Sequence, residues 1–181
     1  MAHVCPAQHV KWIDNFARLW VHNPQKMFAP FVKPGMRVLD VGCGGGFASL
    51  GLARLVGEQG QVFGVDLQPA MLEVVRERAT KAGLEQRIFL HKCTENDLSV
   101  QPAFDFINAF YMVHEVPDQS RFLAQICSLL SPSGQFFMAE PKFHVSADAF
   151  TKTIETAITC GLKPVARPSI RFSHAAVFTP A

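Results

Sequence analysis

Residues 38–46 read VLDVGCGGG, an apolar strand with an acid near its end that runs into a series of glycines. A glycine turn after a strand lets the backbone adopt positive φ angles and approach a ligand closely. The helix expected to begin near Gly46 offers unpaired N–H groups in its first turn. We therefore interpret Gly42, Gly44 and Gly46 as a nucleotide-binding corner. Gly51 lies inside this helix, where a small residue is expected to let the helix pack closely on the sheet.

A second acid, Asp66, follows at the end of the strand predicted over 61–65, where it suits the two hydroxyls of a ribose. The dinucleotide fingerprint requires a small third residue, but Phe47 stands at that position, so the fingerprint fails. Asp40 beside the turn would repel a pyrophosphate, whereas it would attract an ammonium directly or through water. S-adenosylmethionine has that ammonium and a ribose, and it has no phosphate.

The segments VLDVGCGGG (38–46) and VDLQPAML (65–72) together resemble the first two motifs of the class I S-adenosylmethionine-dependent methyltransferases, in particular the small single-domain members with type 11 or type 25 domains. The resemblance covers about residues 34–180. It implies that S-adenosylmethionine is the cofactor. The cofactor-binding residues that it implies are Asp40, Gly42, Gly44, Gly46, Asp66, Leu67, Thr94, Glu95, Ala109 and Phe110.

The later motifs match the family less closely. Thr94 stands where the family usually has an acid that meets the adenine, so Glu95 or the backbone would have to supply this contact. The alternative is that these polar residues only form the exit from a strand. The segment FDFINAF (104–110) resembles the fourth motif, which implies that Ala109 and Phe110 border the methionine part of the cofactor.

The chain from Val38 onward alternates short β-branched or aromatic runs with helical patterns, which is typical of a parallel sheet covered by helices. The predicted strands span 37–41, 61–65, 87–91, 104–110, 134–140, 163–168 and 175–179. The predicted helices span 46–57, 69–82, 118–130 and 148–160. Pro132-Ser133-Gly134 is expected to form a turn, and the apolar strands 104–110 and 135–139 are expected in the middle of the sheet. We thus predict an α/β, Rossmann-like, doubly wound fold with a mostly parallel seven-stranded sheet and helices on both faces.

An amphipathic pattern precedes this fold over residues 9–30. Its apolar positions are Trp12, Ile13, Phe16, Leu19 and Trp20. The pattern predicts an N-terminal capping helix that Pro24 stops or bends. We therefore divide the chain into a helical cap, 1–35, and an S-adenosylmethionine-binding domain, 36–181. The cap either packs on the sheet alone or also covers the cofactor pocket.

Polar side chains follow the two central strands at the edge where ligands of open α/β sheets bind. They are Tyr111, His114, Glu115, Glu140, Lys142 and His144. We take His114, Glu140 and His144 as the candidate catalytic residues. Methyl transfer releases a neutral thioether, so a base is needed for a hydroxyl or protonated amine acceptor but not for a thiolate, a neutral amine or an arsenite-like acceptor. His114 is alternatively a hydrogen-bonded loop histidine.

Zinc chemistry is a poor interpretation of His114-Glu115, because Pro117 intervenes and Asp118 stands where a second histidine would be needed. His3, Cys5, His9 and His22 gather near the N-terminus in a spacing that matches no zinc pattern. They bind a metal or a thiophilic substrate, line the acceptor pocket, or are ordinary surface and capping residues. We predict no metal site.

Composition limits the remaining classes of function. The 181 residues are 49% hydrophobic and 18% charged, with a net charge of +2, so the chain shows no sign of disorder or of a surface that coats nucleic acid. Its five cysteines lie far apart and form neither a zinc pair nor a small disulfide framework. No signal peptide or run of about 20 apolar residues is present. We therefore expect a soluble, cytoplasmic protein.

The sequence thus predicts an S-adenosylmethionine-dependent methyltransferase that acts on a small molecule, without nucleic acid or membrane partners, as a monomer or homodimer. One alternative is a protein that binds S-adenosylmethionine or S-adenosylhomocysteine without chemistry. Another is a dinucleotide-dependent oxidoreductase, which Phe47 and Asp40 disfavour. The identity of the methyl acceptor stays open.

Overall fold

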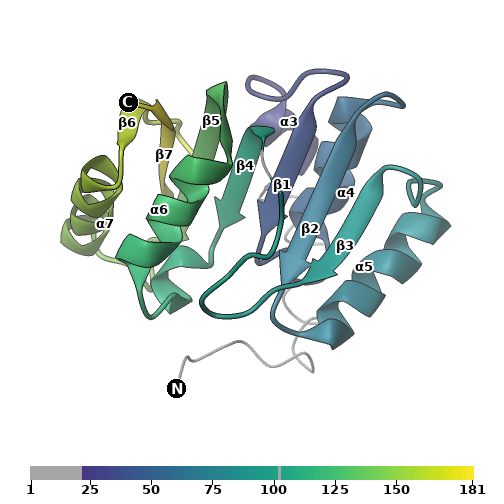
Figure 1. Ribbon diagram of the computed structural model, residues 1–181, viewed down its shortest axis with the longest axis horizontal. Helices are drawn as coiled ribbons and strands as arrows, with labels where there is room; N and C mark the ends of the chain where they lie inside the picture. Colours follow the sequence, from purple (N-terminus) through teal and green to yellow (C-terminus); the bar gives the residue numbers. More distant parts are fainter. Residues whose placement is uncertain (1–21, 102) are drawn as a thin grey trace.

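The computed structural model describes residues 22–101 and 103–181 (Figure 1). Its seven-stranded sheet has the order β3-β2-β1-β4-β5-β7-β6. The strands are β1 (Arg37–Val41), β2 (Gln61–Asp66), β3 (Ile88–Lys92), β4 (Phe104–Phe110), β5 (Leu130–Pro141), β6 (Leu162–Ala166) and β7 (Ser173–Pro180). The first five pair in parallel, whereas β7 is antiparallel to both β5 and β6. The Rossmann-like, mostly parallel sheet is therefore confirmed, and β4 occupies its centre as predicted.

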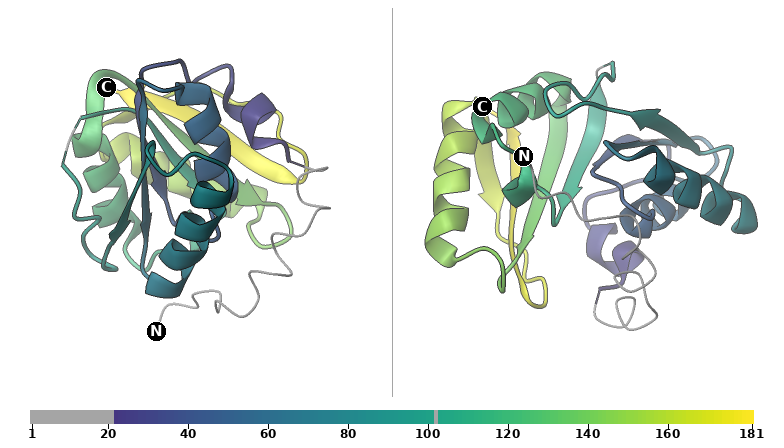
Figure 2. Two further views of the ribbon diagram at one scale, coloured as in Figure 1. Left: turned by 90° about the vertical axis from the view of Figure 1, so that its right-hand side faces the viewer. Right: turned by 90° about the horizontal axis from the view of Figure 1, so that it is seen from below.

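Helices cover both faces of the sheet (Figure 2). They are α3 (Pro24–Phe28), α4 (Phe47–Val56), α5 (Pro69–Lys81), the 3-10 turn η2 (Val113–Glu115), α6 (Gln119–Leu129) and α7 (Ala147–Thr159). Local chemistry sets their starts, since the side chains of Asp118 and Ser146 accept backbone N–H groups in the first turns of α6 and α7. Apolar residues of α3, α4 and α5 pack on one face, and those of α6 and α7 pack on the other.

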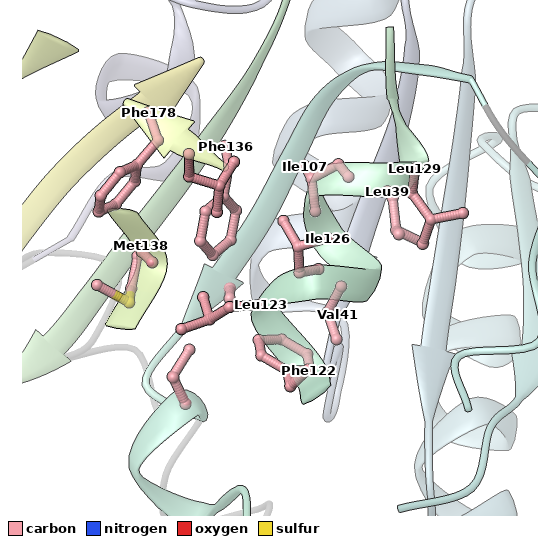
Figure 3. Close-up of a cluster of buried hydrophobic side chains, with 14 of the residues drawn as sticks. Leu39, Val41, Ile107, Phe122, Leu123, Ile126, Leu129, Phe136, Met138 and Phe178 are labelled. Carbon is pink, nitrogen blue, oxygen red and sulfur yellow. The ribbon is translucent and has the colours of Figure 1, made fainter. Parts of the chain in front are cut away.

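The core under α6 shows why the central strands are fixed. Leu123 and Ile126 of α6 are fully buried with Ile107 of β4 and Phe136 and Met138 of β5 (Figure 3). Burying side chains of this kind stabilises a fold by about 1.5–3 kcal/mol each. The carboxyl ends of β4 and β5 are therefore held on a rigid scaffold.

The turn that the sequence predicts at residues 132–134 is not present. Pro132-Ser133-Gly134 lies within β5, where Leu130 pairs with Phe104 and Gln135 with Phe106, so the extra residues form a bulge rather than a turn. A Cβ at Gly134 would lie 2.7 Å from the carbonyl oxygen of Phe104, so only glycine fits at this bulge.

Gly51 permits close packing, but its neighbour is α3 rather than the sheet. A Cβ at Gly51 would lie 2.5 Å from the Cβ of Pro24. Pro24 is the first residue of α3, with the side chain of Asn23 accepting the N–H of Lys26, so a helix begins at this proline. The predicted stop or bend at Pro24 concerns the segment that precedes it, which lies outside the described residues, so it stays a prediction. Most of the predicted capping helix, including its apolar stripe, lies outside the described residues, and the division at residue 35 stays a prediction.

Candidate functional site

The strand order reverses between β1 and β4, where β2 and β3 lie to one side and β5 to the other. Ligands of open α/β sheets bind beyond the carboxyl ends of the strands at such a switch point. This edge is the lower edge of the sheet in Figure 1. The carboxyl-terminal ends of β1 to β5 and the loops that follow these strands carry the predicted site residues.

The turn after β1 has the conformation that its glycines predict. Gly42, Gly44 and Gly46 have φ angles of +64°, +50° and +85°. Apart from its chain neighbours, no atom of the described residues lies within 4 Å of the position that a Cβ would take at Gly44, which leaves room for a ligand to approach the backbone. The Gly44 N–H donates to Oδ2 of Asp66 at 2.9 Å. This bond joins the two sequence motifs.

The carboxylate of Asp66 is fixed at the end of β2. Its Oδ1 accepts the N–H of Gln68 at 2.9 Å, and only 8% of the residue is exposed. Burial raises the pKa of Asp66, while the hydrogen bonds from Gln68 and Gly44 lower it. Each carboxylate oxygen retains acceptor capacity, so the group fits the ribose role predicted for it. Leu67 follows it and packs against the core.

Asp40 is 2% exposed, and both of its oxygens have protein partners. The Ser49 hydroxyl donates to Oδ2, and the Asn108 amide donates to Oδ1 at 2.7 Å. Burial raises the pKa of Asp40 to about 6. Asp40 therefore braces β1 against α4 and β4, and its charge is close to the glycine turn. The sequence interpretation missed Ser49 and Asn108, although a lone amide in the apolar half of FDFINAF was a usable signal.

Thr94 and Glu95 are exposed on the loop after β3. Thr94 closes a turn there, because its N–H donates to the carbonyl of Asp97 at 2.9 Å and its hydroxyl accepts the Asp97 N–H at 3.0 Å. The Cys93 N–H donates to the carbonyl of Asp66 at 3.1 Å, which brings this loop beside the glycine turn. The contacts of Thr94 match the strand-exit interpretation, while its contact with adenine stays a prediction.

The loop after β4 packs on the glycine turn. A Cβ at Gly42 would lie 3.1 Å from the Cβ of Met112. Ala109 is fully buried in β4, whereas the Phe110 ring stacks on Tyr111 at 4.2 Å and lies 5.8 Å from Phe47. These contacts place Phe110 next to the start of α4.

Tyr111 has a φ of +65°, a left-handed conformation that costs a residue with a side chain about 1–3 kcal/mol. Its hydroxyl lies 2.6 Å from the hydroxyl of Ser173 at the start of β7. This contact joins the β4 loop to the antiparallel hairpin, and no sequence pattern indicates Ser173. Strain of this kind is typical of functional sites.

The three predicted catalytic residues lie together at this edge. Glu140, 2% exposed at the end of β5, accepts the backbone N–H of Val113 at 2.8 Å through Oε1. Its Oε2 pairs with Nδ1 of His114. The His144 ring stacks on His114 with centroids 5.8 Å apart. A buried carboxylate thus orients one histidine, and a second histidine lies against it.

The electrostatics of this cluster favour a protonatable imidazole. The hydrogen bond to Glu140 raises the pKa of His114, and burial opposes the rise. Burial also raises the pKa of Glu115, to which the charges of Glu140 and Asp66 add. Met112 packs against Gly42, and the N–H of Val113 donates to Glu140, so the loop after β4 links the glycine turn to the histidine cluster.

Within the described part of the chain, no group of three His, Cys, Asp or Glu residues could hold a metal ion. His22 instead has Nε2 2.7 Å from the carbonyl oxygen of Arg171, and its ring meets Phe110 edge-on at 5.5 Å. His3, Cys5 and His9 lie outside the described residues. Among the helices of residues 22–101 and 103–181, none is long and apolar enough to cross a membrane.

Comparisons with known proteins agree with this geometry. A model of the family described as "Methyltransferase domain" matches residues 32–163. The aklanonic acid methyltransferase DauC of Streptomyces sp. (strain C5) is 34% identical over 116 residues, which are 64% of this chain and 53% of that protein. The ubiquinone biosynthesis O-methyltransferase of Xanthomonas euvesicatoria pv. vesicatoria (strain 85-10) is 37% identical over 106 residues, 58% of this chain and 43% of that protein. The chain spans about half the length of these relatives.

The fold has a close counterpart among solved structures. The crystal structure of an S-adenosylmethionine-dependent methyltransferase from Aquifex aeolicus superposes with a TM-score of 0.89 at 24% identity, and it covers 98% of this chain and 100% of its own. At this identity the likeness shows the fold, while the family model covers most of the chain. Together with the glycine turn and Asp66 at the switch point, these findings establish that the chain belongs to the class I S-adenosylmethionine-dependent methyltransferases.

Proposed function

We propose that the protein transfers a methyl group from S-adenosylmethionine to a hydroxyl oxygen of a small-molecule acceptor, with His114 as the base. The observation that carries this proposal is the pairing of Nδ1 of His114 with the buried carboxylate of Glu140. Because that pairing uses Nδ1, Nε2 is the nitrogen available to an acceptor. A thiolate or neutral amine would not need such a base, whereas a hydroxyl must lose its proton during the reaction.

The residues around the glycine turn fit S-adenosylmethionine. Asp66 would accept from the ribose hydroxyls, Gly42, Gly44 and Gly46 would admit the ligand to the backbone, and the buried charge of Asp40 would favour its ammonium. The cofactor supplies a sulfonium-bound methyl group. A bulkier residue at Gly44 would fill the open space through which the ligand would reach the backbone.

The chain itself would position the acceptor and move one proton. The acceptor oxygen attacks the methyl carbon, the carbon–sulfur bond breaks with its electron pair going to sulfur, and the acceptor proton passes to Nε2 of His114. Glu140 would stabilise the resulting imidazolium, since it is negatively charged and already hydrogen-bonded to Nδ1. His144 would contact the acceptor beside His114, with which it stacks.

Two relatives support a small molecule as the acceptor, and the name of one of them supports oxygen as the acceptor atom. One is named for aklanonic acid and the other as an O-methyltransferase of ubiquinone biosynthesis. We further propose, from composition and cysteine spacing, that the protein acts in the cytoplasm as a monomer or homodimer. Neither a nucleic acid nor a membrane partner is part of the proposal.

The test is methyl transfer by the full chain to a panel of phenols and alcohols, thiols and amines, with products identified by mass spectrometry. His114→Gln should lower turnover of a hydroxyl acceptor by about 10²–10⁴-fold and leave the affinity for S-adenosylhomocysteine unchanged. His91→Gln is the matched control, because His91 is exposed on β3 away from the cluster. Full turnover by His114→Gln would contradict the base, and binding of cofactor without any product would favour a protein that only binds it.

A further inference from the structure

A cavity lies beside the proposed reaction centre, between the start of α7 and the loop that joins β6 to β7. Its volume is about 280 Å³. In the view from below in Figure 2, the loop between β6 and β7 lies next to the end of β5. The Lys142 N–H holds the two together by donating to the carbonyl of Phe172 at 3.0 Å. The cavity therefore opens at the same edge of the sheet as the glycine turn.

The titratable groups of the described residues that line this cavity are all basic. They are Lys142, Arg167 and His174. Phe150 of α7 lies between two of them, with its ring 5.4 Å from that of His174 and 5.8 Å from the Arg167 guanidinium carbon. Among the described residues, neither Lys142 nor Arg167 forms an ion pair. Two exposed cations and an imidazole thus line a space that no carboxylate of residues 22–101 or 103–181 lines.

The sheet register connects this cavity to the His114 pair. His174 lies directly opposite Glu140 in the antiparallel ladder of β5 and β7, and Ser173 lies opposite Pro141. Ser173 lines the cavity and also meets the hydroxyl of Tyr111 at 2.6 Å. One strand pair thus carries the carboxylate that orients His114 and the histidine that lines the basic cavity.

We infer that this cavity binds an anionic group of the methyl acceptor, a carboxylate or a phosphate; the inference rests on the proposed function. Arg167 would bind two oxygens of such a group through its planar guanidinium, and Lys142 would add a second charge. A whole small-molecule site usually occupies about 300–1,000 Å³, so this volume suits one group of a ligand whose remainder extends toward His114.

The surroundings also suit an apolar body on that acceptor. Phe143, which follows Lys142, is 74% exposed, and Phe172, which precedes Ser173, is 54% exposed. The Phe143 ring lies 4.8 Å from His144, which in turn stacks on His114. A hydroxylated aromatic acid or aryl phosphate could therefore rest on apolar surface between the cavity and the base.

The experiment measures binding by calorimetry to the full chain saturated with S-adenosylhomocysteine. The probes are two matched pairs: a dihydroxybenzoate with its neutral amide, and phenyl phosphate with phenol. We expect at least one anion to bind about tenfold more tightly than its neutral partner, because charge-assisted hydrogen bonds form only with the anion. A preference confined to one pair identifies the carboxylate or the phosphate as the group bound.

Arg167→Gln should abolish this preference, and Arg167→Lys should retain part of it. Lys163→Gln is the matched control, because Lys163 is an exposed cation on β6 that does not line the cavity. Equal binding within both pairs, or a preference that survives Arg167→Gln, would overturn the inference. If the preference depends on Arg167 but no methyl transfer occurs, the anion site stands and the proposed function fails.

Discussion

His114 and Glu140 are separated by the length of a helix and a strand in the sequence, yet they form one hydrogen-bonded pair. The buried carboxylate fixes the imidazole through Nδ1, and the backbone N–H of Val113 fixes the carboxylate at 2.8 Å. Such pairs recur in enzymes wherever a histidine must take a proton at a defined nitrogen. At the scale of single residues, this arrangement therefore makes the clearest prediction about pH.

The neutral form of His114 is the one that accepts a proton, and it is lost as pH falls below its pKa. Because Glu140 raises this pKa, the acidic limb of the rate profile should lie above the ordinary value of 6.5. Glu140→Gln should move the limb to lower pH and reduce the maximal rate by about tenfold or more. Glu85→Gln, on an exposed residue far from the cluster, should change neither. An acidic limb that stays in place in Glu140→Gln would contradict the role of the pair.

Asp40 predicts a second pH effect at the cofactor. Its pKa is about 6 because burial disfavours the charge, so it is ionised at about pH 8 and protonated at about pH 5. Asp40→Asn should weaken the binding of S-adenosylhomocysteine about tenfold at about pH 8, since the ammonium loses one charge partner, and change it little at about pH 5. Calorimetry at both pH values checks this. The same loss at both would mean that Asp40 acts only as a structural brace.

A site residue can be predicted from the sequence when a local pattern marks it, and it cannot when only contacts between distant strands place it. The glycines and Asp66 were identified because positive φ and close approach leave a mark in the sequence, and all three turn glycines have positive φ. Asn108, Ser49 and Ser173 were missed, because their partners are set by contacts between distant strands that no local pattern encodes. His114, Glu140 and His144 could be placed together only through the rule that strand ends share an edge.

At the scale of elements, a matched pair of glycine substitutions separates the loss of ligand space in the turn after β1 from the cost of backbone strain. Gly44 and Gly83 both have positive φ, +50° and +65°, and a Cβ at either would lie more than 4 Å from every described residue other than its chain neighbours. Gly83 follows α5, outside the proposed site. The two substitutions to alanine should therefore cost similar stability.

Gly44→Ala alone should weaken the binding of S-adenosylhomocysteine, by about tenfold or more, because the added methyl group occupies space that the ligand needs. Gly83→Ala should bind as the parent does after correction for the folded fraction. Thermal unfolding and calorimetry on both variants measure the two effects separately. Equal affinity in both variants would mean that the turn after β1 does not hold the cofactor.

Most elements were predictable, because hydrophobic periodicity and capping residues mark them locally. The strand over 104–110 and the helix starts at Pro69 and after Asp118 match the structure closely. The residues Pro132-Ser133-Gly134 suit both a turn and a bulge, and only their pairing with β4 distinguishes the two. The antiparallel placement of β7 likewise depends on the path of the whole chain rather than on its own residues.

At the scale of the whole molecule, the strand order β3-β2-β1-β4-β5-β7-β6 explains why the proposed site residues lie at one edge of the sheet. The parallel strands β1, β2 and β4 bring the proposed cofactor residues and His114 to this edge, and β5 with the hairpin brings Glu140 and the basic cavity. A methyl donor and an acceptor would thus be held from opposite sides of the switch point. The methyl donor and the acceptor would lie side by side next to His114.

A crystal structure of the full chain with S-adenosylhomocysteine tests this account most directly. We predict that the ribose contacts Asp66, that the amino-acid part crosses Gly42 and Gly44, and that the sulfur lies within about 8 Å of Nε2 of His114, since an acceptor oxygen at about 3–3.5 Å from the methyl carbon must fit between them. A ligand bound elsewhere, or a sulfur farther from His114 than this, would contradict the central claim that one edge of the sheet joins the cofactor to the base.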